Sequence, residues 1–219
     1  MHCRCFIALT LASAWLGVAQ PGRAQGTIAY SQPASPIVLR DEFFGQFYSF
    51  DMDGDANSEL TFGYDFHFVG VRNENGTRSL SFVNPPPDFY ADPQPLPSGF
   101  LIGPESGSGQ LQWFTSYPPP YNFNNLVTIV NTGTSGAFAG QHAYMGIEFQ
   151  RASGTHYGWV SLYVDWFAPV AVIDSWAWET RPGVPILAGA VPEPSTCVLL
   201  VGGCVLVVWF RRKRNERRG

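Results

Sequence analysis

The sequence predicts an all-β fold: an antiparallel β-sandwich or jelly-roll-like domain, flanked by an N-terminal signal-peptide helix and a C-terminal transmembrane helix. Within residues 25–190, several stretches alternate apolar and polar side chains with a period of two, as strands with one buried face do. Clusters of Gly, Pro and Asn separate these stretches, and no convincing amphipathic helix lies among them. About nine or ten strands divided by turns are typical of such a domain.

The first clear strand is expected at residues 59–69. Its even-numbered positions are apolar, starting with Leu60, and its odd-numbered positions are mainly polar, so one face is expected to be buried. Asn75-Gly76 is a hairpin turn signal that predicts a following strand at 79–83. Proline-rich and glycine-rich segments predict surface loops at 85–87, 92–97, 103–109 and 118–120.

The second half of the domain follows the same pattern. Alternation there predicts that only one side of each strand belongs to the core. Residues 131–140 are mostly small and are expected to form a loop. Strands are expected at 126–130, 144–151, 155–165, 171–180 and 186–188.

The N-terminal segment, residues 1–24, has the parts of a secretory signal peptide. A basic residue precedes an apolar stretch, and a small-x-small pattern ends at Ala24, after which cleavage is expected, with Ala19 as the alternative. The apolar stretch is shorter than a membrane-spanning helix, which favours removal over retention. The expected mature domain is therefore 25–190, followed by a tail at 191–219.

Cysteine and charge counts limit the chemistry of residues 25–190. All four cysteines lie outside this range, so a thiol nucleophile and a thiolate metal site are excluded there. The range holds 15 acidic and five basic residues, a net charge near −10. Nucleic acid is an unlikely partner for so acidic a domain, whereas cations and neutral or cationic polymers remain candidates. The cysteines are Cys3, Cys5, Cys197 and Cys204.

The tail has three parts: Val-Pro-Glu-Pro-Ser, an uncharged run at 196–210, and a basic end. As a helix the run spans only about 22 Å, against roughly 30 Å of bilayer hydrocarbon. Six of the eight residues after Phe210 are basic, however. Such a cluster stays cytoplasmic and its long side chains reach the interface, so a transmembrane helix is predicted at 196–210. The stop-transfer residues are Arg211, Arg212, Lys213 and Arg214.

This three-part tail resembles the PEP-CTERM sorting signal of exported bacterial proteins, through Pro192-Glu193-Pro194, the Gly202-Gly203 pair and the closing arginines. The resemblance implies that a membrane-embedded enzyme, exosortase, recognises the tail and cuts near Pro-Glu-Pro. The prolines also hold this segment extended and open to a protease. A plain proline-rich linker before an ordinary anchor is the other interpretation. The predicted sorting motif is Val191, Pro192, Glu193, Pro194 and Ser195.

Residues 51–59 are the clearest candidate for a binding site. Oxygen-bearing side chains occupy every second position, and a curled loop can direct them onto one Ca²⁺ ion. The stretch is similar to EF-hand and dockerin-like loops, although Ala56 stands where glycine is expected and Phe62 where a bidentate carboxylate is expected. A solvated Asp-Gly turn is the other interpretation, and both remain open. The candidate ligands are Asp51, Asp53, Asp55, Asn57 and Glu59.

Aromatic and histidine residues supply two weaker hypotheses. Exposed aromatic faces can stack on sugars, but large rings also fill sandwich cores. Histidines beside Ser and Asp would suit a hydrolase, yet no catalytic motif surrounds them. The residues concerned are Trp113, Trp159, Trp166, Trp176, Trp178, His67, His142 and His156.

Together these features predict an exported, non-enzymatic cell-surface or extracellular-matrix protein. The expected location is the inner membrane, at least transiently through the C-terminal helix, and then the cell surface or exterior. Expected partners are exosortase and the membrane, with exopolysaccharide as a further candidate and no nucleic acid. The alternatives are a Ca²⁺-dependent or glycan-binding adhesion module, a secreted hydrolase, and a permanent single-pass membrane protein.

Overall fold

The structure is a computed structural model that describes residues 27–40, 46–64, 68–84, 90–117, 123–130, 133–165 and 170–192. Thr27–Val191 form a compact unit. Its described part contains fifteen strands and one short 3₁₀-helix, all strand pairs within sheets being antiparallel. The all-β prediction is therefore confirmed for this part. The predicted signal peptide and transmembrane helix lie outside the described residues, and no helix inside them is long and apolar enough to cross a membrane.

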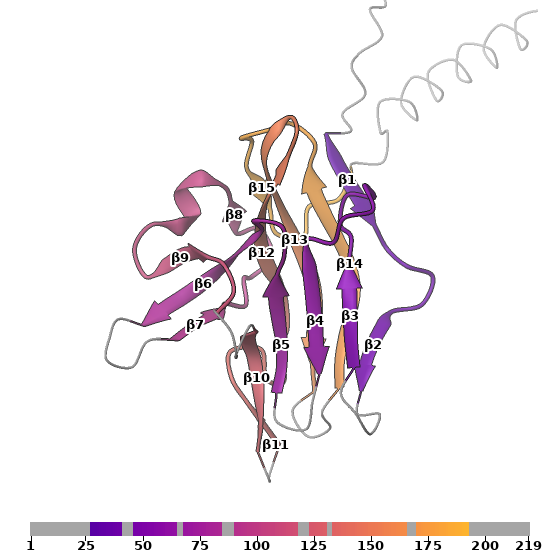
Figure 1. Cartoon of the computed structure of the whole chain (residues 1–219), viewed down its shortest axis with the longest axis vertical. Helices are drawn as coiled ribbons and strands as arrows, with labels where there is room; N and C mark the ends of the chain where they lie inside the picture. Colours follow the sequence, from indigo (N-terminus) through magenta and orange to yellow (C-terminus); the bar gives the residue numbers. More distant parts are fainter. Residues whose placement is uncertain are drawn as a thin grey trace, which may run out of the picture. The chain divides into compact units, whose positions relative to one another are not determined.

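The largest sheet has eight strands and contains the longest ones (Figure 1). Its order is β1-β14-β13-β12-β6-β7, with β2 pairing with β14 and β9 with β6. The long strands β12, β13 and β14 run side by side as two successive hairpins, so they form the centre of the domain. The bounds are β1 Ile28–Ser31, β2 Ile37–Arg40, β6 Arg78–Asn84, β7 Tyr90–Pro93, β9 Leu111–Phe114, β12 His142–Arg151, β13 Gly154–Val164 and β14 Val170–Glu179.

A five-stranded sheet and a two-stranded sheet complete the domain. The first has the order β11-β10-β5-β4-β3, and the second consists of β8 and β15. The 3₁₀-helix η1 follows β8 at Pro104–Gly107. The strand bounds are β3 Gln46–Phe50, β4 Leu60–Tyr64, β5 Phe68–Asn73, β8 Leu101–Ile102, β10 Asn124–Val130, β11 Gly133–Ser135 and β15 Ile186–Leu187.

The main core lies between the eight-stranded and five-stranded sheets. In Figure 1, β3, β4 and β5 lie in front of the long strands of the larger sheet. Apolar side chains from both sheets join one buried cluster, as expected for the predicted sandwich. Strand β4 contributes Leu60, Phe62 and Tyr64, and β13 contributes Val160 and Leu162.

A second core covers the opposite face of the larger sheet. Tyr157 and Trp159 of β13 pack there with Ile102 of β8 and Ile186 of β15. Trp159 and its neighbour Val160 are both fully buried, although they point to opposite faces. The prediction that only one side of each strand is core is therefore wrong for β13. The small sheet supplies the layer that buries the second side.

The structure divides the predicted strand at 59–69. Strand β4 ends at Tyr64 and the chain returns as β5, with Leu60 opposite Asn73 and Tyr64 opposite Val69. Pairing the two halves lets both contribute to the main core, since Val69 is buried there as well.

The Asn75-Gly76 turn forms, but it does not make a hairpin. Both residues have positive φ, 47° and 78°, and the amide of Thr77 donates to the carbonyl of Glu74 at 2.8 Å. The strands on either side, β5 and β6, belong to different sheets. The turn therefore carries the chain from one layer to the other.

Three predicted loops contain regular structure. Strand β7 overlaps 92–97, η1 lies within 103–109, and β11 lies within 131–140. Each is four residues long or shorter, so it carries too few residues for a periodic pattern to appear. Such short elements also raise the strand count above the nine or ten expected.

Candidate functional site

The acidic loop, residues 51–59, connects β3 to β4 at one end of the five-stranded sheet. The amide of Glu59 donates to the carbonyl of Phe50 at 3.0 Å and closes the loop at its base. Met52, within the loop, is buried in the main core. The loop is thus attached to the domain by a hydrogen bond and by an apolar side chain.

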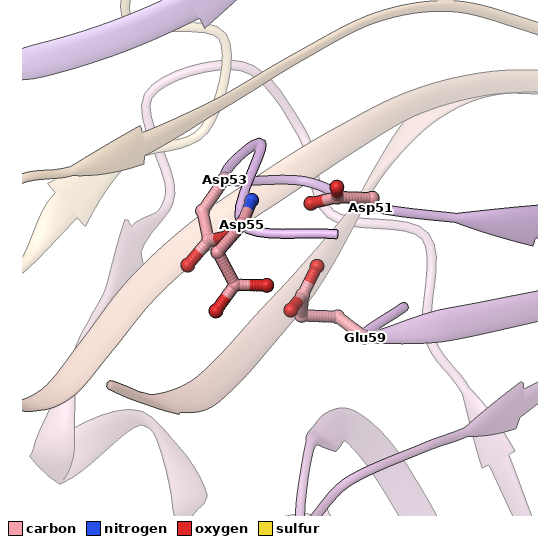
Figure 2. A group of neighbouring side chains, drawn as sticks. All are labelled: Asp51, Asp53, Asp55 and Glu59. Atoms are coloured by element: carbon pink, nitrogen blue, oxygen red, sulfur yellow. The ribbon is translucent and has the colours of Figure 1, made fainter. Parts of the chain in front are cut away.

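Four of the five predicted ligands come together. Asp51, Asp53, Asp55 and Glu59 each offer a carboxylate oxygen, and these four oxygens lie within 4.8 Å of one another. Figure 2 shows Asp51, Asp55 and Glu59 directed toward a shared space, with Asp53 beside Asp55. Asn57, the fifth predicted ligand, is exposed. The loop therefore brings four carboxylates together, and their use as metal ligands stays a prediction.

Backbone amides of the loop hold the aspartates in place. Asp51 accepts hydrogen bonds from the amides of Gly54 at 2.7 Å and Ala56 at 2.9 Å, one on each oxygen. Asp53 accepts from the amide of Asp55 at 3.1 Å, and Asp55 from that of Asn57 at 2.8 Å. Each bond uses one lone pair of an oxygen that has two, so coordination capacity remains.

The loop contains a residue in a strained conformation. Gly54 and Ala56 both have positive φ, 76° and 71°. Glycine adopts this region freely, but a residue with a Cβ atom pays about 1 kcal/mol there. The departure from the glycine expected at position 56 is therefore tolerated at an energetic cost, because the amide of Ala56 bonds to Asp51.

Arg151 contacts the acidic loop from the other sheet. Its Nε lies 2.7 Å from Oδ2 of Asp53, whose side chain is almost fully buried. The guanidinium also lies 4.7 Å from the ring centroid of Trp178, a cation–π arrangement. Arg151 ends β12, far from the loop in sequence, and nothing in its local sequence marks it as a partner of Asp53.

Glu59 is the second carboxylate of the cluster with a buried side chain. One oxygen accepts a hydrogen bond from the amide of Met52 at 2.6 Å. The pKa of Glu59 is raised to about 7, mainly by burial and also by the charges of Asp53 and Asp51, while the hydrogen bond from the Met52 amide opposes the change. Burial likewise raises the pKa of Asp53, against the opposing charge of Arg151. The loop therefore stores electrostatic repulsion that a cation would relieve.

The donor set fits a hard divalent cation. Four carboxylates supply oxygen ligands of the type that Ca²⁺ prefers, and Ca²⁺ tolerates irregular geometry. Arg151 would compete with a bound cation for Asp53, because it already neutralises one oxygen of that carboxylate. Among the described residues, no other ion pair with this loop occurs.

The tryptophans fill the cores. Trp159 and Trp178 are buried, and Trp113 and Trp176 are half-buried against the two cores. Trp166 lies outside the described residues. Within the described part, the exposed large aromatic side chains are instead Phe47 and Tyr48 of β3, so the four described tryptophans do not supply an exposed stacking surface for sugars.

The two candidate histidines that the structure describes occupy different settings, and His67 lies outside the described residues. His156 is fully buried, with Nδ1 2.8 Å from the carbonyl oxygen of Glu179 and Nε2 2.7 Å from Oγ of Ser153. His142 is exposed, and its Nε2 approaches both Oδ2 of Asp174 at 2.6 Å and Oγ of Ser161 at 3.1 Å. In a catalytic triad the acid and the serine bond to opposite ring nitrogens. The His142 group differs from that geometry.

The folded domain extends into the start of the predicted sorting motif. Ala188 is buried in the second core and Ala190 packs against it. The amide of Ala190 donates to the carbonyl of Leu187 at 2.9 Å, and Val191 follows, exposed. The remaining predicted residues of the tail lie outside the described residues: Glu193, Pro194, Ser195, Arg211, Arg212, Lys213 and Arg214.

A cysteine-free β domain whose last strand leads directly into a Pro-Glu-Pro segment has the organisation of an exported protein with a C-terminal processing signal. Comparison with known families supports this class: residues 190–214 match the PEP-CTERM protein-sorting motif. The motif marks an exported protein sorted by exosortase, a membrane enzyme, and it confirms the resemblance seen in the sequence. Neither the curated proteins nor the solved structures contain a match to the chain.

Proposed function

We propose that the chain is a non-enzymatic cell-surface or matrix protein whose β domain is delivered and then released or re-attached through its tail. The PEP-CTERM motif at residues 190–214 carries this proposal. The tail would anchor the protein in the inner membrane through 196–210 until exosortase cuts near Pro-Glu-Pro. Both cores are packed without cysteine, so packing alone stabilises the delivered domain.

Intact mass spectrometry of the protein from an exosortase-containing host tests this proposal. We expect the mature form to begin near residue 25 and to lack the arginine-rich end. In a host without exosortase, the same chain should keep its tail and remain in the membrane fraction. A chain that retains the tail in both hosts would instead indicate a permanent single-pass membrane protein.

We further propose that the acidic loop binds Ca²⁺ and stabilises the domain, in keeping with an adhesion role. The convergence of four carboxylates within 4.8 Å carries this second proposal. Asp51, Asp55 and Glu59 would provide most of the ligands. Asp53 would contribute its second oxygen, because Arg151 holds the first. The ion would supply charge neutralisation and fix the loop between β3 and β4.

Calorimetric titration with Ca²⁺ and with Mg²⁺ tests the metal site. We expect heat of binding and a higher melting temperature with Ca²⁺, and a weaker response with Mg²⁺, which demands stricter octahedral geometry. Asp55→Asn should weaken binding at least tenfold, because it removes a charged ligand. Glu105→Gln, a change at an exposed carboxylate of η1, is the matched control and should leave binding unchanged. A titration without heat and without a change in melting temperature would contradict the proposal.

Exopolysaccharide remains a proposed partner. Its support is the exposure of the rings of Phe47 and Tyr48, since aromatic faces can stack on sugars. A glycan array with the mature protein tests it. Binding should fall at least tenfold in Phe47→Ser, whereas Leu101→Ser, a change at an exposed apolar side chain elsewhere, serves as the control.

A further inference from the structure

Exposed aliphatic side chains gather where the chain leaves the domain. Leu101 is 57% exposed, Leu187 48% and Val191 46%. Leu101 and Leu187 are direct partners across the β8–β15 pair, so their side chains are neighbours. Among the described residues, the remaining exposed large apolar side chains, Phe47 and Tyr48, both lie on β3 of another sheet. We call Leu101, Leu187 and Val191, with the segments that carry them, the exit patch.

The exit patch is also free of charge. It is built from residues 96–104 and 182–192, and these twenty residues contain no Asp, Glu, Lys or Arg. The two segments are joined by the β8–β15 pairing and by hydrogen bonds between Ala188 and the backbone of Gly99 and Phe100, at 2.9 and 2.8 Å. In a domain with fifteen acidic residues, an uncharged surface of this kind loses little solvation when it enters an apolar environment.

The backbone of the exit patch has a fixed conformation up to the start of the tail. Ile186 and Ala188 are buried in the second core, which fixes Leu187 between them as an outward-facing residue. Gly189 has a φ of 78°, and a Cβ atom there would lie 2.7 Å from the hydroxyl of Tyr144. The backbone therefore leaves the domain in a defined conformation at Val191.

The distance from the exit patch to the bilayer is limited by chain length. Only residues 192–195 separate Val191 from the apolar run at 196–210. Five residue steps span at most about 17 Å even when fully extended. A domain held this close has an effective concentration at the membrane on the order of millimolar or higher, so a weak apolar contact is sufficient.

We propose that the exit patch docks on the lipid surface while the tail is inserted, with Leu101, Leu187 and Val191 at the headgroup–acyl boundary. This inference depends on the membrane insertion proposed for the tail. The occupant is the bilayer because the short tether brings the bilayer to this surface before any soluble partner. The patch holds the domain in one orientation at the membrane and keeps Pro-Glu-Pro close to the interface, where a membrane-embedded enzyme reaches it.

Hydroxyl-radical footprinting of the full chain in vesicles of phosphatidylethanolamine and phosphatidylglycerol tests the docking. Flotation comes first: the chain must travel with the vesicles and resist carbonate extraction. We then measure the oxidation of Leu101 and Leu187, normalised to Phe47 in the same molecule, and expect it to be at least threefold lower in the parent chain than in either of two variants. One variant is Leu187→Glu, in which only the oxidation of Leu101 is compared. The other carries several tens of Gly and Ser residues inserted after Ser195, which lowers the effective concentration but leaves the patch intact.

Each outcome decides the question. A chain that fails to float contradicts the membrane tail and, with it, the docking. A chain that floats but shows equal oxidation of Leu101 in the parent and in both variants contradicts the docking alone. Protection that increases with the protein-to-lipid ratio would identify a second copy of the chain as the occupant and would also overturn the inference. An unchanged melting temperature of Leu187→Glu shows that this variant is folded.

Discussion

At the scale of single residues, two buried carboxylates determine the behaviour of the acidic loop. Glu59 is buried beside Asp51 and Asp53, and its pKa is raised to about 7, first by burial and then by those charges. Asp53 is almost fully buried and depends on the guanidinium of Arg151. Keeping either carboxylate charged inside the folded domain costs free energy, so each gives a measurable effect on stability when its charge is changed.

Glu59→Gln should change how stability depends on pH. The folded-state pKa of Glu59 is raised from 4.5 to about 7. The contribution of Glu59 to the free energy of unfolding is therefore fully present below pH 4.5 and is lost as the pH rises through about 7. At about 1.4 kcal/mol per pH unit, the loss is roughly 3 kcal/mol by pH 8. Urea unfolding with a chelator present, at pH 5 and pH 8, should show this fall in the parent and a smaller fall in Glu59→Gln.

The informative quantity is the difference between the two proteins across pH, because other groups titrate as well. Glu105→Gln, at an exposed position, should keep the pH dependence of the parent. Parallel curves for the parent and Glu59→Gln would show that Glu59 ionises normally in the folded domain.

Arg151→Gln should destabilise the domain by about 2–4 kcal/mol in the absence of Ca²⁺, because it leaves the buried charge of Asp53 without its partner. Arg72→Gln is the matched control, since Arg72 also pairs with a carboxylate, Glu74, and lies over an aromatic ring, Phe123, but is more exposed. Its cost should be about 1 kcal/mol or less. Urea unfolding measures both, and equal losses in the two variants would argue against a special role for the Asp53 pair.

At the scale of strands, the periodic pattern predicted the main core and missed the second. Leu60, Phe62 and Tyr64 are buried as their alternation indicates, because β4 is long enough for the pattern to be visible. The second core depends on β8 and β15, which have two residues each and therefore no period. Packing of these short strands against the sheet is a long-range property that local sequence does not encode.

The candidate site shows the same division between local and distant information. The cluster of Asp51, Asp53, Asp55 and Glu59 was predictable, because all four lie within one loop and their spacing is local. The contact with Arg151 was not, because it depends on how the two sheets face each other. Short-range chemistry is therefore readable from the sequence here, whereas pairing between layers requires the fold.

Substitutions on the two faces of β13 should both be costly. Leu162→Ala removes a side chain from the main core and Trp159→Ala removes one from the second core, and each should cost about 3 kcal/mol. Gln112→Ala, at an exposed position of β9, should cost less than about 0.5 kcal/mol. Denaturant unfolding measures the three changes. A Trp159→Ala variant as stable as Gln112→Ala would show that the second face of β13 is not packed in solution.

At the scale of the whole molecule, the folded domain and the tail have separate roles that meet at residues 190–192. The domain supplies two packed cores, and the PEP-CTERM motif at 190–214 supplies the sorting information. The motif starts before the fold ends, since Ala190 packs against the second core. Few residues therefore separate the folded domain from the segment that exosortase recognises.

Reducing agents should not affect the stability of the mature domain. The cysteines at positions 3, 5, 197 and 204 all lie outside residues 25–190, so no disulfide can contribute to the cores. Melting curves of the mature protein with and without dithiothreitol should coincide. A lower melting temperature under reducing conditions would show that the protein still carries cysteine, and therefore an uncut tail or signal peptide.

The pairing of β1 with β14 has a consequence for secretion. Ile28 lies opposite Glu179, and the amide of Thr180 donates to the carbonyl of Thr27 at 2.6 Å, so the first strand finds its neighbour only near the end of the domain. Contacts between such distant segments form late and slowly. Polypeptide emerging from a translocation channel therefore stays incompletely folded until almost the entire domain has crossed, and the sheet becomes able to close only as the PEP-CTERM segment follows.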